Sequence, residues 1–284
     1  MDKYYLSQKI TESTTVIGDI TGVQMYLVEG RRRAMLIDAG NGLPGLREAV
    51  SEVTSLPVDV LLTHGHCDHA SGAAWFDTVY LNRKDWKLTE FHTSLPMRKA
   101  FVKLWVHKQI VSAIPDDAWC PPRSHGFLPL EDGQTFDLGG VTLEAITVPG
   151  HTQGMTCVLN REERWILYGD ACSTQEFLWL PESSPVEEYL ESLGRLRDLR
   201  DRYDTVFMSH HITCAPPGLL DGVMDVCRDV LDGRSDEEPF AFLGQRGLLR
   251  AKRANILGKR FDGRIGNLVY RKDNIYKGED SYGP

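Results

Sequence analysis

The stretch Leu61–Ala70, LLTHGHCDHA, places three histidines and one aspartate within six consecutive residues. The chain has nine histidines in all, so a third of them lie in this one motif. A buried imidazole needs a partner for each ring nitrogen, so a hydrophobic core has no use for such a run. The short apolar segment before it, residues 57–63, is typical of a buried strand. Imidazole and carboxylate are both good Zn²⁺ ligands, so the motif is a candidate metal site on a rigid support.

Three further apolar segments end at residues of the same chemical types. His151 follows AITVPG, Asp170 follows WILYG, and the pair His210 and His211 follows TVFMS. A metal site needs several ligands that converge from rigid supports, and strand ends supply such supports. The sequence therefore predicts that these side chains meet the HGHCDH motif around bound metal.

The motifs HxHxDH, PGHT, YGD and a final strand-end histidine, in this order, resemble the signature of the metallo-β-lactamase-fold hydrolases. The resemblance covers about residues 15–225. It implies an α+β protein, a four-layer αβ/βα sandwich with a helical insertion and a C-terminal extension. We expect a catalytic domain over residues 1–233 with the insertion at about 83–126, and an extension over 234–284 packed on the same domain.

The resemblance also implies a two-metal site with a residue at every ligand position. The ligands would be His64, His66 and His151 for the first metal, Asp68, His69 and His210 for the second, and Asp170 as the bridge between them. Asp38 matches the family's strand-end aspartate and would orient a ligand. His211 is the alternative to His210. Asp68 is also the catalytic candidate, because it can take or orient the proton of the attacking hydroxide.

The residue types favour hydrolysis at neutral pH. Two divalent cations, two ligand carboxylates and a bridging hydroxide sum to about +1, which favours an anionic or polarised small-molecule substrate. Metal binding lowers the pKa of water from about 15.7 to about 7. The sequence thus predicts a dinuclear hydrolase, with two Zn²⁺ ions and with iron or manganese as alternatives. Its metal-bridging hydroxide would attack a carbonyl substrate: a thioester, lactone, ester or amide.

Other functions remain open at this stage. Asp170 and His69 resemble the glyoxalase II and lactonase branches, whereas zinc β-lactamases lack the bridging aspartate. A two-metal site also suits phosphodiester hydrolysis of a small substrate. An iron-dependent oxidoreductase of the same fold is a third interpretation, although flavodiiron proteins carry glutamate where this chain has His66. The remaining interpretation is a binding module with a degenerate site. Such a protein would be expected to have lost metal ligands, and this chain has lost none.

Composition limits the classes of partner and the cellular compartment that we expect for this chain. The net charge of -8 and pI of about 5.6 argue against a general nucleic-acid binder. No apolar run is long enough to predict a membrane span. The six cysteines are scattered without a CxxC pair, which is typical of a reduced, cytoplasmic protein. The oligomeric state stays open.

The segments outside the motifs give weaker signals. Residues 95–114 predict one amphipathic helix, with Phe101, Leu104 and Trp105 in a packing stripe. A second helix is expected to start at the N-cap Ser184. His92, His107 and His125 lie outside the motifs, so surface or structural roles are expected for them.

Overall fold

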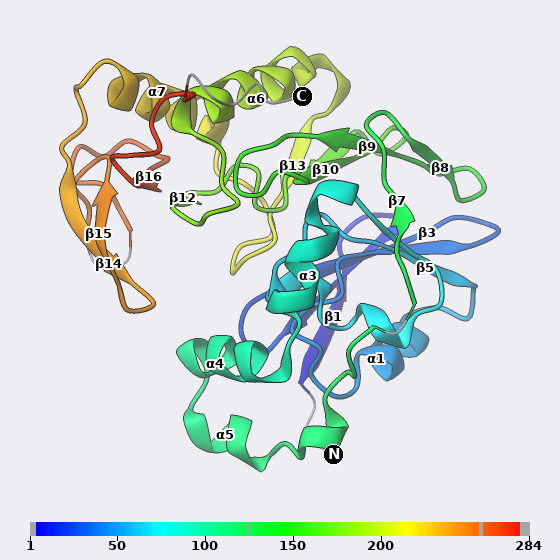
Figure 1. Cartoon of the computed structure of the whole chain (residues 1–284). Coiled ribbons are helices and arrows are strands. Elements are labelled where there is room, and N and C mark those ends of the chain that lie inside the picture. The colour runs from blue at the N-terminus through cyan, green and yellow to red at the C-terminus, as the bar shows by residue number, and fades with distance from the viewer. Residues whose placement is uncertain (1–3, 124, 256–257, 279–284) are drawn as a thin grey trace.

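The computed structural model describes residues 4–123, 125–255 and 258–278. Two large sheets lie face to face and helices cover their outer sides, so the chain forms the expected four-layer αβ/βα sandwich (Figure 1). The N-terminal half supplies the first sheet and its helices, and the segment after residue 130 supplies the second. No helix in the described ranges is long and apolar enough to cross a membrane.

The first sheet runs in chain order. Its strands are β1 (Tyr5–Lys9), β2 (Thr14–Asp19), β3 (Gln24–Glu29), β4 (Ala34–Ile37), β5 (Val58–Leu61), β6 (Val79–Leu81) and β7 (Leu128–Pro129). The strands from β1 to β4 form an antiparallel meander, and those from β4 to β7 are parallel. The helices that follow in this half are α1 (Leu46–Val53), α2 (Cys67–Ala70), α3 (Trp86–His92), α4 (Leu95–Trp105) and α5 (Lys108–Ala113).

The second sheet has the order β13-β11-β10-β9-β8. Its strands are β8 (Thr135–Asp137), β9 (Thr142–Thr147), β10 (Thr156–Asn160), β11 (Trp165–Leu167) and β13 (Thr205–Phe207). Two helices, α6 (Val186–Asp198) and α7 (Leu219–Leu231), cover its outer face. In Figure 1 they lie above the sheet, on the side away from α1.

The alternation of strand side chains explains the layers. In β4 every residue is buried, and successive side chains point to opposite faces of the sheet. Met35 and Ile37 pack with Val158 and Trp165 of the second sheet in the central layer. Leu36 packs in the other direction, in the core beneath the helices of the first half. The sequence of such a strand is a continuous apolar run because both of its faces are covered.

A third, smaller sheet connects the C-terminal residues to the rest of the chain. It has the order β12-β16-β15-β14, with β12 (Glu176–Leu178), β14 (Glu238–Phe242), β15 (Gln245–Arg250) and β16 (Leu268–Tyr270). Because β12 directly follows the Asp170 segment and pairs in parallel with β16, residues after 233 are hydrogen-bonded to a strand beside the predicted site.

The structure corrects the expectations for two helices. Residues 95–114 form two helices, with a break between Trp105 and Lys108. On α4 the buried side chains are Arg98 and Val102, one turn apart, while Leu104 and Trp105 stay largely exposed. The predicted packing of Leu104 and Trp105 was therefore wrong. Leu104 points away from the buried pair, and Trp105, one turn beyond Val102, is the last residue of the helix and stays uncovered. The start of α6 also differs, since Pro185 occupies the N-cap position in place of the predicted Ser184.

Candidate metal centre

All seven predicted ligand residues lie together where strands of the two large sheets end. Their side-chain nitrogen and oxygen atoms form overlapping groups whose members lie within 4.8 Å of one another. Strand ends and one short helix supply them: His64 and His66 after β5, Asp68 and His69 in α2, His151 after β9, Asp170 after β11, and His210 after β13. The supports are buried, so the geometry is held by the core.

The first cluster consists of three histidines whose nitrogens face one another. The Nδ1 of His66 lies 3.1 Å from Nε2 of His64 and 2.9 Å from Nε2 of His151. All three rings are buried. A nitrogen–nitrogen contact of this length needs either a shared proton or a cation between the lone pairs.

The contacts of the opposite ring nitrogen fix the tautomer of His64. The Thr63 hydroxyl donates its single hydrogen to the Asp38 carboxylate, at 2.9 and 3.0 Å from the two oxygens. The same Thr63 oxygen lies 3.0 Å from Nδ1 of His64 and therefore accepts a hydrogen bond from it. The Nε2 of His64 is then left with a lone pair that points into the cluster.

The other two rings are fixed in the same way. The Nε2 of His66 donates to the Glu182 carboxylate at 2.9 Å, which leaves Nδ1 as the lone-pair atom. The Nδ1 of His151 donates to the backbone carbonyl of Phe177 at 3.0 Å and lies 3.1 Å from the Glu176 carboxylate. Three lone pairs therefore converge, which is the donor set that a divalent transition metal takes.

The second cluster combines imidazoles with carboxylates. The Nδ1 of His69 donates to Asp38 at 2.8 Å, so its Nε2 carries the lone pair. That Nε2 lies 3.6 Å from Asp68 and 3.3 Å from Nε2 of His210. The His210 Nε2 is 3.6 Å from the same Asp68 oxygen. Asp38 thus orients one ring of each cluster, directly for His69 and through Thr63 for His64.

Asp170 lies between the two clusters. Its Oδ2 is 3.2 Å from Nε2 of His210 and 3.6 Å from Nε2 of His69 in the second cluster, and 3.7 Å from Nε2 of His151 in the first. Its Oδ1 is buried and has no hydrogen-bond partner among the described residues. A buried carboxylate oxygen without a partner is costly. A cation on either side of this carboxylate would satisfy it, so the residues present fit a pair of metal ions.

Protons bind differently to the two clusters of the metal-free protein. Burial and the neighbouring imidazoles lower the pKa of His64 far below its usual range and that of His66 to about 4, against the opposing effect of Glu182 on His66. Burial also opposes protonation of His69 and His210, but the ligand carboxylates outweigh it and raise both pKa values.

His151, the remaining histidine of the first cluster, has a raised pKa, as do the two histidines of the second cluster. Burial lowers the pKa of His151, but the Glu176 carboxylate outweighs burial and raises that pKa to about 9. Burial would raise the pKa of Asp170, yet the adjacent His210 and His69 hold it well below its ordinary value. Without metal, protons therefore take the place of cations at this end of the site.

A buried aspartate outside the predicted set ties the two ligand loops together. Asp85 accepts hydrogen bonds from the backbone N–H of Gly65 at 3.0 Å, from that of Gly154 at 2.7 Å, and from the Thr152 hydroxyl at 2.6 Å. Gly65 lies between two ligand histidines and Thr152 directly follows His151. This single carboxylate thus sets the distance between the HGHCDH and PGHT loops.

Several functional neighbours were missed from the sequence. Glu176, Glu182 and Asp85 occur in segments whose spacing carries no signal for the site. His92, expected at the surface or in a structural role, packs its ring 4.6 Å from that of His66 and lies 3.6 Å from Glu182. The role of Thr63 could have been predicted from the sequence, because it is a hydroxyl residue at a strand end directly before the first ligand.

The two adjacent histidines at the end of β13 have different surroundings. His210 belongs to the second cluster through Asp68 and Asp170, as described above. The ring of His211 lies 6.2 Å from that of His210 and 5.2 Å from that of Trp105. His211 therefore lies beside the cluster, against the insertion.

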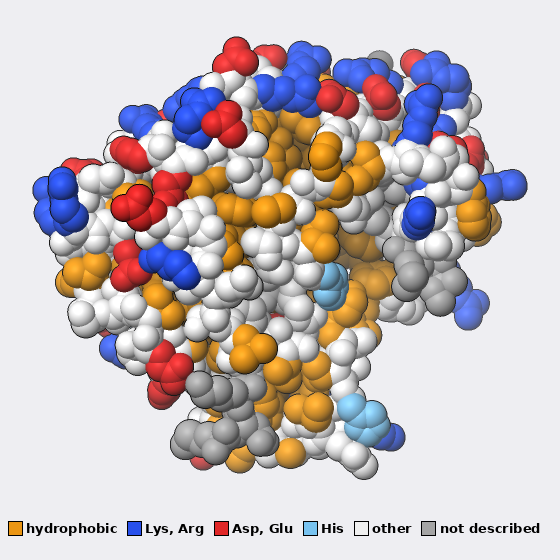
Figure 2. Space-filling model, turned by 180° about the vertical axis from the view of Figure 1, so that it is seen from behind, with side chains coloured by type: hydrophobic (Ala, Val, Ile, Leu, Met, Phe, Trp, Pro, Cys, Tyr) orange, Lys and Arg blue, Asp and Glu red, His pale blue; other side chains and the backbone are white. Residues whose placement is uncertain are grey.

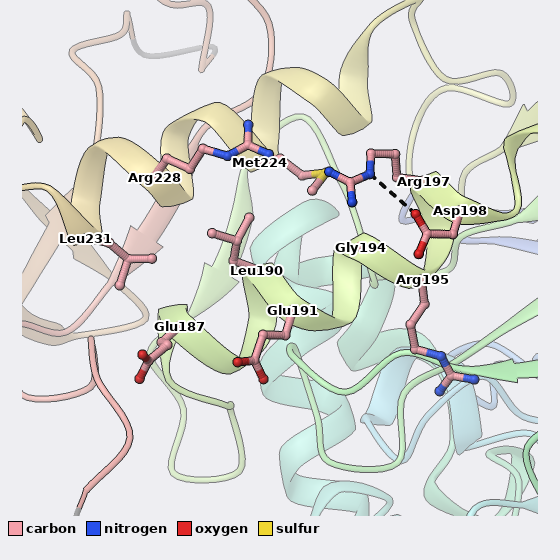
Figure 3. A pocket seen from close by; sticks show the side chains of 10 residues that line it. All are labelled: Glu187, Leu190, Glu191, Gly194, Arg195, Arg197, Asp198, Met224, Arg228 and Leu231. Carbon is pink, nitrogen blue, oxygen red and sulfur yellow. Dashed lines mark ion pairs between the residues drawn. The ribbon is translucent and has the colours of Figure 1, made fainter.

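A surface hollow of about 530 Å³ lies elsewhere, between α6 and α7 (Figure 3). It is lined by charged residues, including the ion pair of Arg197 and Asp198, and by a few apolar ones such as Leu190 and Met224. None of the predicted ligands lines it. We therefore assign the hollow no part in the chemistry of the histidine clusters.

The sequence profile of the metallo-beta-lactamase superfamily matches residues 18–210, a span that includes all seven candidate ligands. The chain belongs to this superfamily. The match stops short of residues 211–284, so the profile does not cover the C-terminal extension.

Curated relatives include acyl-coenzyme A thioesterases. The chicken (Gallus gallus) protein MBLAC2 is 28% identical over 193 residues, which cover 63% of this chain and 68% of the relative. The human protein of the same name is 27% identical over 200 residues, with the same coverage. An atrochrysone carboxyl ACP thioesterase of Aspergillus fumigatus is 27% identical over 155 residues, 53% of this chain and 30% of the relative.

Solved structures agree on the fold. A metallo-beta-lactamase from Pontibacter korlensis superposes with a TM-score of 0.57 at 16% identity, covering 79% of this chain and 99% of that one. The sec-alkylsulfatase Pisa1 from Pseudomonas superposes with a TM-score of 0.62 at 14% identity, covering 81% and 42%. The predicted sandwich is thus confirmed. Superfamily membership together with the thioesterase relatives supports a hydrolase, and the site has candidate groups for divalent metal.

Proposed function

We propose that this protein is a two-metal thioesterase that hydrolyses acyl thioesters of a small carrier thiol. The observation that carries the proposal is the convergence of two donor clusters on one shared carboxylate, Asp170, whose second oxygen has no partner among the described residues. The names of the thioesterase relatives support a thioester among the carbonyl substrates. Zinc suits the mixture of imidazole and carboxylate donors.

In this proposal His64, His66 and His151 would hold the first ion, Asp68, His69 and His210 would hold the second, and Asp170 would be shared. When bound, such ions supply a nucleophile from water at neutral pH and polarise the scissile carbonyl. The domain division expected from the sequence is part of the proposal: residues 1–233 carry this chemistry, and residues 234–284 pack against it through β16.

The chain's own residues would hold the ligands and move the proton. Asp38 and Glu182 keep proton-bearing nitrogens turned away from the clusters, so that lone pairs face inward. Asp68, whose carboxylate lies 3.6 Å from Nε2 of both His69 and His210, would accept the proton of the attacking water and pass it to the departing thiolate. Water adds to the carbonyl carbon, the carbon–sulfur bond breaks, and a carboxylic acid and a thiol leave.

A substrate panel with defined metal content tests the proposal. Metal-free protein should be inactive, and two equivalents of zinc should restore turnover of an acyl-coenzyme A thioester in preference to lactones and phosphodiesters. Asp68→Asn should bind the second zinc ion more weakly and turn over slowly, and Asp137→Asn, an exposed aspartate remote from the clusters, serves as the control. One equivalent of iron with oxygen uptake and no hydrolysis would overturn the proposal.

A further inference from the structure

The end of α4 and the turn after His210 present exposed apolar side chains beside the second cluster. Large hydrophobic residues are normally covered, yet Leu104 is 49% exposed, Trp105 44% and Ile212 42%. Trp105 is the last residue of α4, and Ile212 follows His211 directly. Figure 2 shows a broad band of hydrophobic side chains reaching the surface on the back of the molecule. We call Leu104, Trp105, His211 and Ile212 the apolar rim.

The apolar rim is joined to the candidate metal ligands by direct contacts. The Trp105 ring lies 5.2 Å from the His211 ring, which lies 6.2 Å from that of His210. Only one residue separates Ile212 from His210. A molecule whose reacting atom sits at the second cluster would therefore have His211 and Trp105 close by, with Ile212 next along the chain.

The position of His211 is enforced by the backbone. Its φ of 58° is in the left-handed region, which costs a non-glycine residue energy and persists only where the surroundings impose it. Its N–H donates to the carbonyl of Gly22 at 2.8 Å. A Cβ on Gly22 would approach the His211 ring to 2.4 Å, so only glycine leaves room for the ring. The histidine is thus held against Trp105 by a strained turn and a matched glycine.

We propose that the apolar rim binds the acyl chain of the substrate and makes the enzyme selective for medium and long chains. This inference rests on the proposed thioesterase function and adds the part of the substrate that the metal clusters do not contact. An acyl chain is the occupant that fits, because the rim is apolar and continuous with the place where the carbonyl would react. Burial of each methylene group against such side chains favours binding.

The test compares octanoyl- and acetyl-coenzyme A as substrates of three variants. Trp105→Ala removes the largest side chain of the rim. His211→Asn removes the ring and keeps a residue that tolerates positive φ, so it guards against misfolding. The control is Leu6→Ala, which shortens a hydrophobic side chain on β1 that is more exposed than those of the rim. We expect the ratio of octanoyl to acetyl kcat/KM to fall about tenfold in Trp105→Ala, less in His211→Asn, and to stay constant in the control.

A second readout separates this inference from the proposed function. Binding of a dansyl-labelled fatty acid to metal-free protein, followed by fluorescence, requires no hydrolysis. If the protein cleaves no thioester but Trp105→Ala still weakens this binding, the result supports acyl-chain binding at the apolar rim and contradicts the thioesterase proposal. Thioester turnover with an unchanged chain-length ratio in both rim variants would overturn the inference alone. A dimer in solution that Trp105→Ala converts to monomer, with no change in chain-length ratio, would also overturn it and assign the rim to a second copy of the chain.

Discussion

The two halves of the metal centre would each bind one metal ion, but they offer different donor residues. The first cluster presents three imidazole nitrogens, and the second adds the Asp68 carboxylate to two imidazoles. Outer partners fix all three tautomers in the first half, whereas in the second half Asp38 fixes only that of His69 and the charge of Asp68 attracts both protons and cations. The comparison teaches that the first ion would be held by oriented lone pairs and the second mainly by charge.

Asp170 is the one carboxylate that both halves share, so its removal should have the largest effect. Asp170→Asn keeps the volume and removes the charge between the clusters. We expect both zinc equivalents to bind more weakly and kcat/KM to fall by more than about a hundredfold, beyond the range for outer partners of a metal site. Elemental analysis and steady-state kinetics check this, and a variant that retains two zinc ions and full turnover would show that Asp170 bridges nothing.

Asp38 should come next, because it orients a ring in each half. In Asp38→Asn an amide replaces the carboxylate that accepts from His69 and from Thr63. Loss of such an outer partner lowers metal affinity or activity by about 10–100-fold. Thr63→Val sharpens the comparison, since it breaks only the link to His64 and should weaken the first ion while sparing the second. Equal loss of both ions in Thr63→Val would contradict separate halves.

Glu182 acts on the first half alone. Glu182→Gln leaves His66 free to adopt the other tautomer, with a hydrogen on Nδ1 facing the cluster. We expect about a tenfold loss of affinity for one zinc ion and no change for the other, measured by competition with a chelator. Glu191→Gln, at an exposed ion pair on α6, is the matched control. An unchanged first-site affinity would mean that the partner of His66 is not needed to fix its tautomer.

Lowering the pH should release the second-site ion before the first-site ion. We expect this effect to be gradual and smaller than the effects of the substitutions above. A proton and a metal ion compete for the same lone pair. The pKa values of His69 and His210 are raised in the metal-free second cluster, whereas in the first only His151 is raised, to about 9. Two histidines of the second site but only one of the first thus bind protons more strongly than a free imidazole, so protons compete better for the second site as the pH falls. Zinc release followed against pH should show the second-site ion leaving first, and simultaneous release would remove the distinction between the halves.

The grouping of the seven candidate ligands could be predicted from the sequence, because they lie at or just after strand ends and follow the order of the family motifs. The apolar strands predict where the chain reverses, and the histidines and aspartates at those points can only be explained by convergence. The sandwich follows from the same strands, since an apolar run such as β4 must be covered on both faces.

The outer partners could not be predicted, because they reach the site only through tertiary structure. Glu182 contacts His66 from 116 positions away, and Asp85 reaches Gly154 across 69. Neither lies in a periodic pattern or a motif. The exposure of Trp105 could not be predicted for a related reason. Trp105 lies one turn beyond the buried Val102 on the same side of α4, and it stays open because the helix ends there, which periodicity does not show.

The central claim is that two ions share Asp170, and a calorimetric zinc titration of the metal-free protein tests it most directly. The account predicts two equivalents per chain, with thioester turnover rising as the second is added, and weakening of both binding events in Asp170→Asn. A single equivalent that supports full turnover, or two equivalents unaffected by Asp170→Asn, would contradict it.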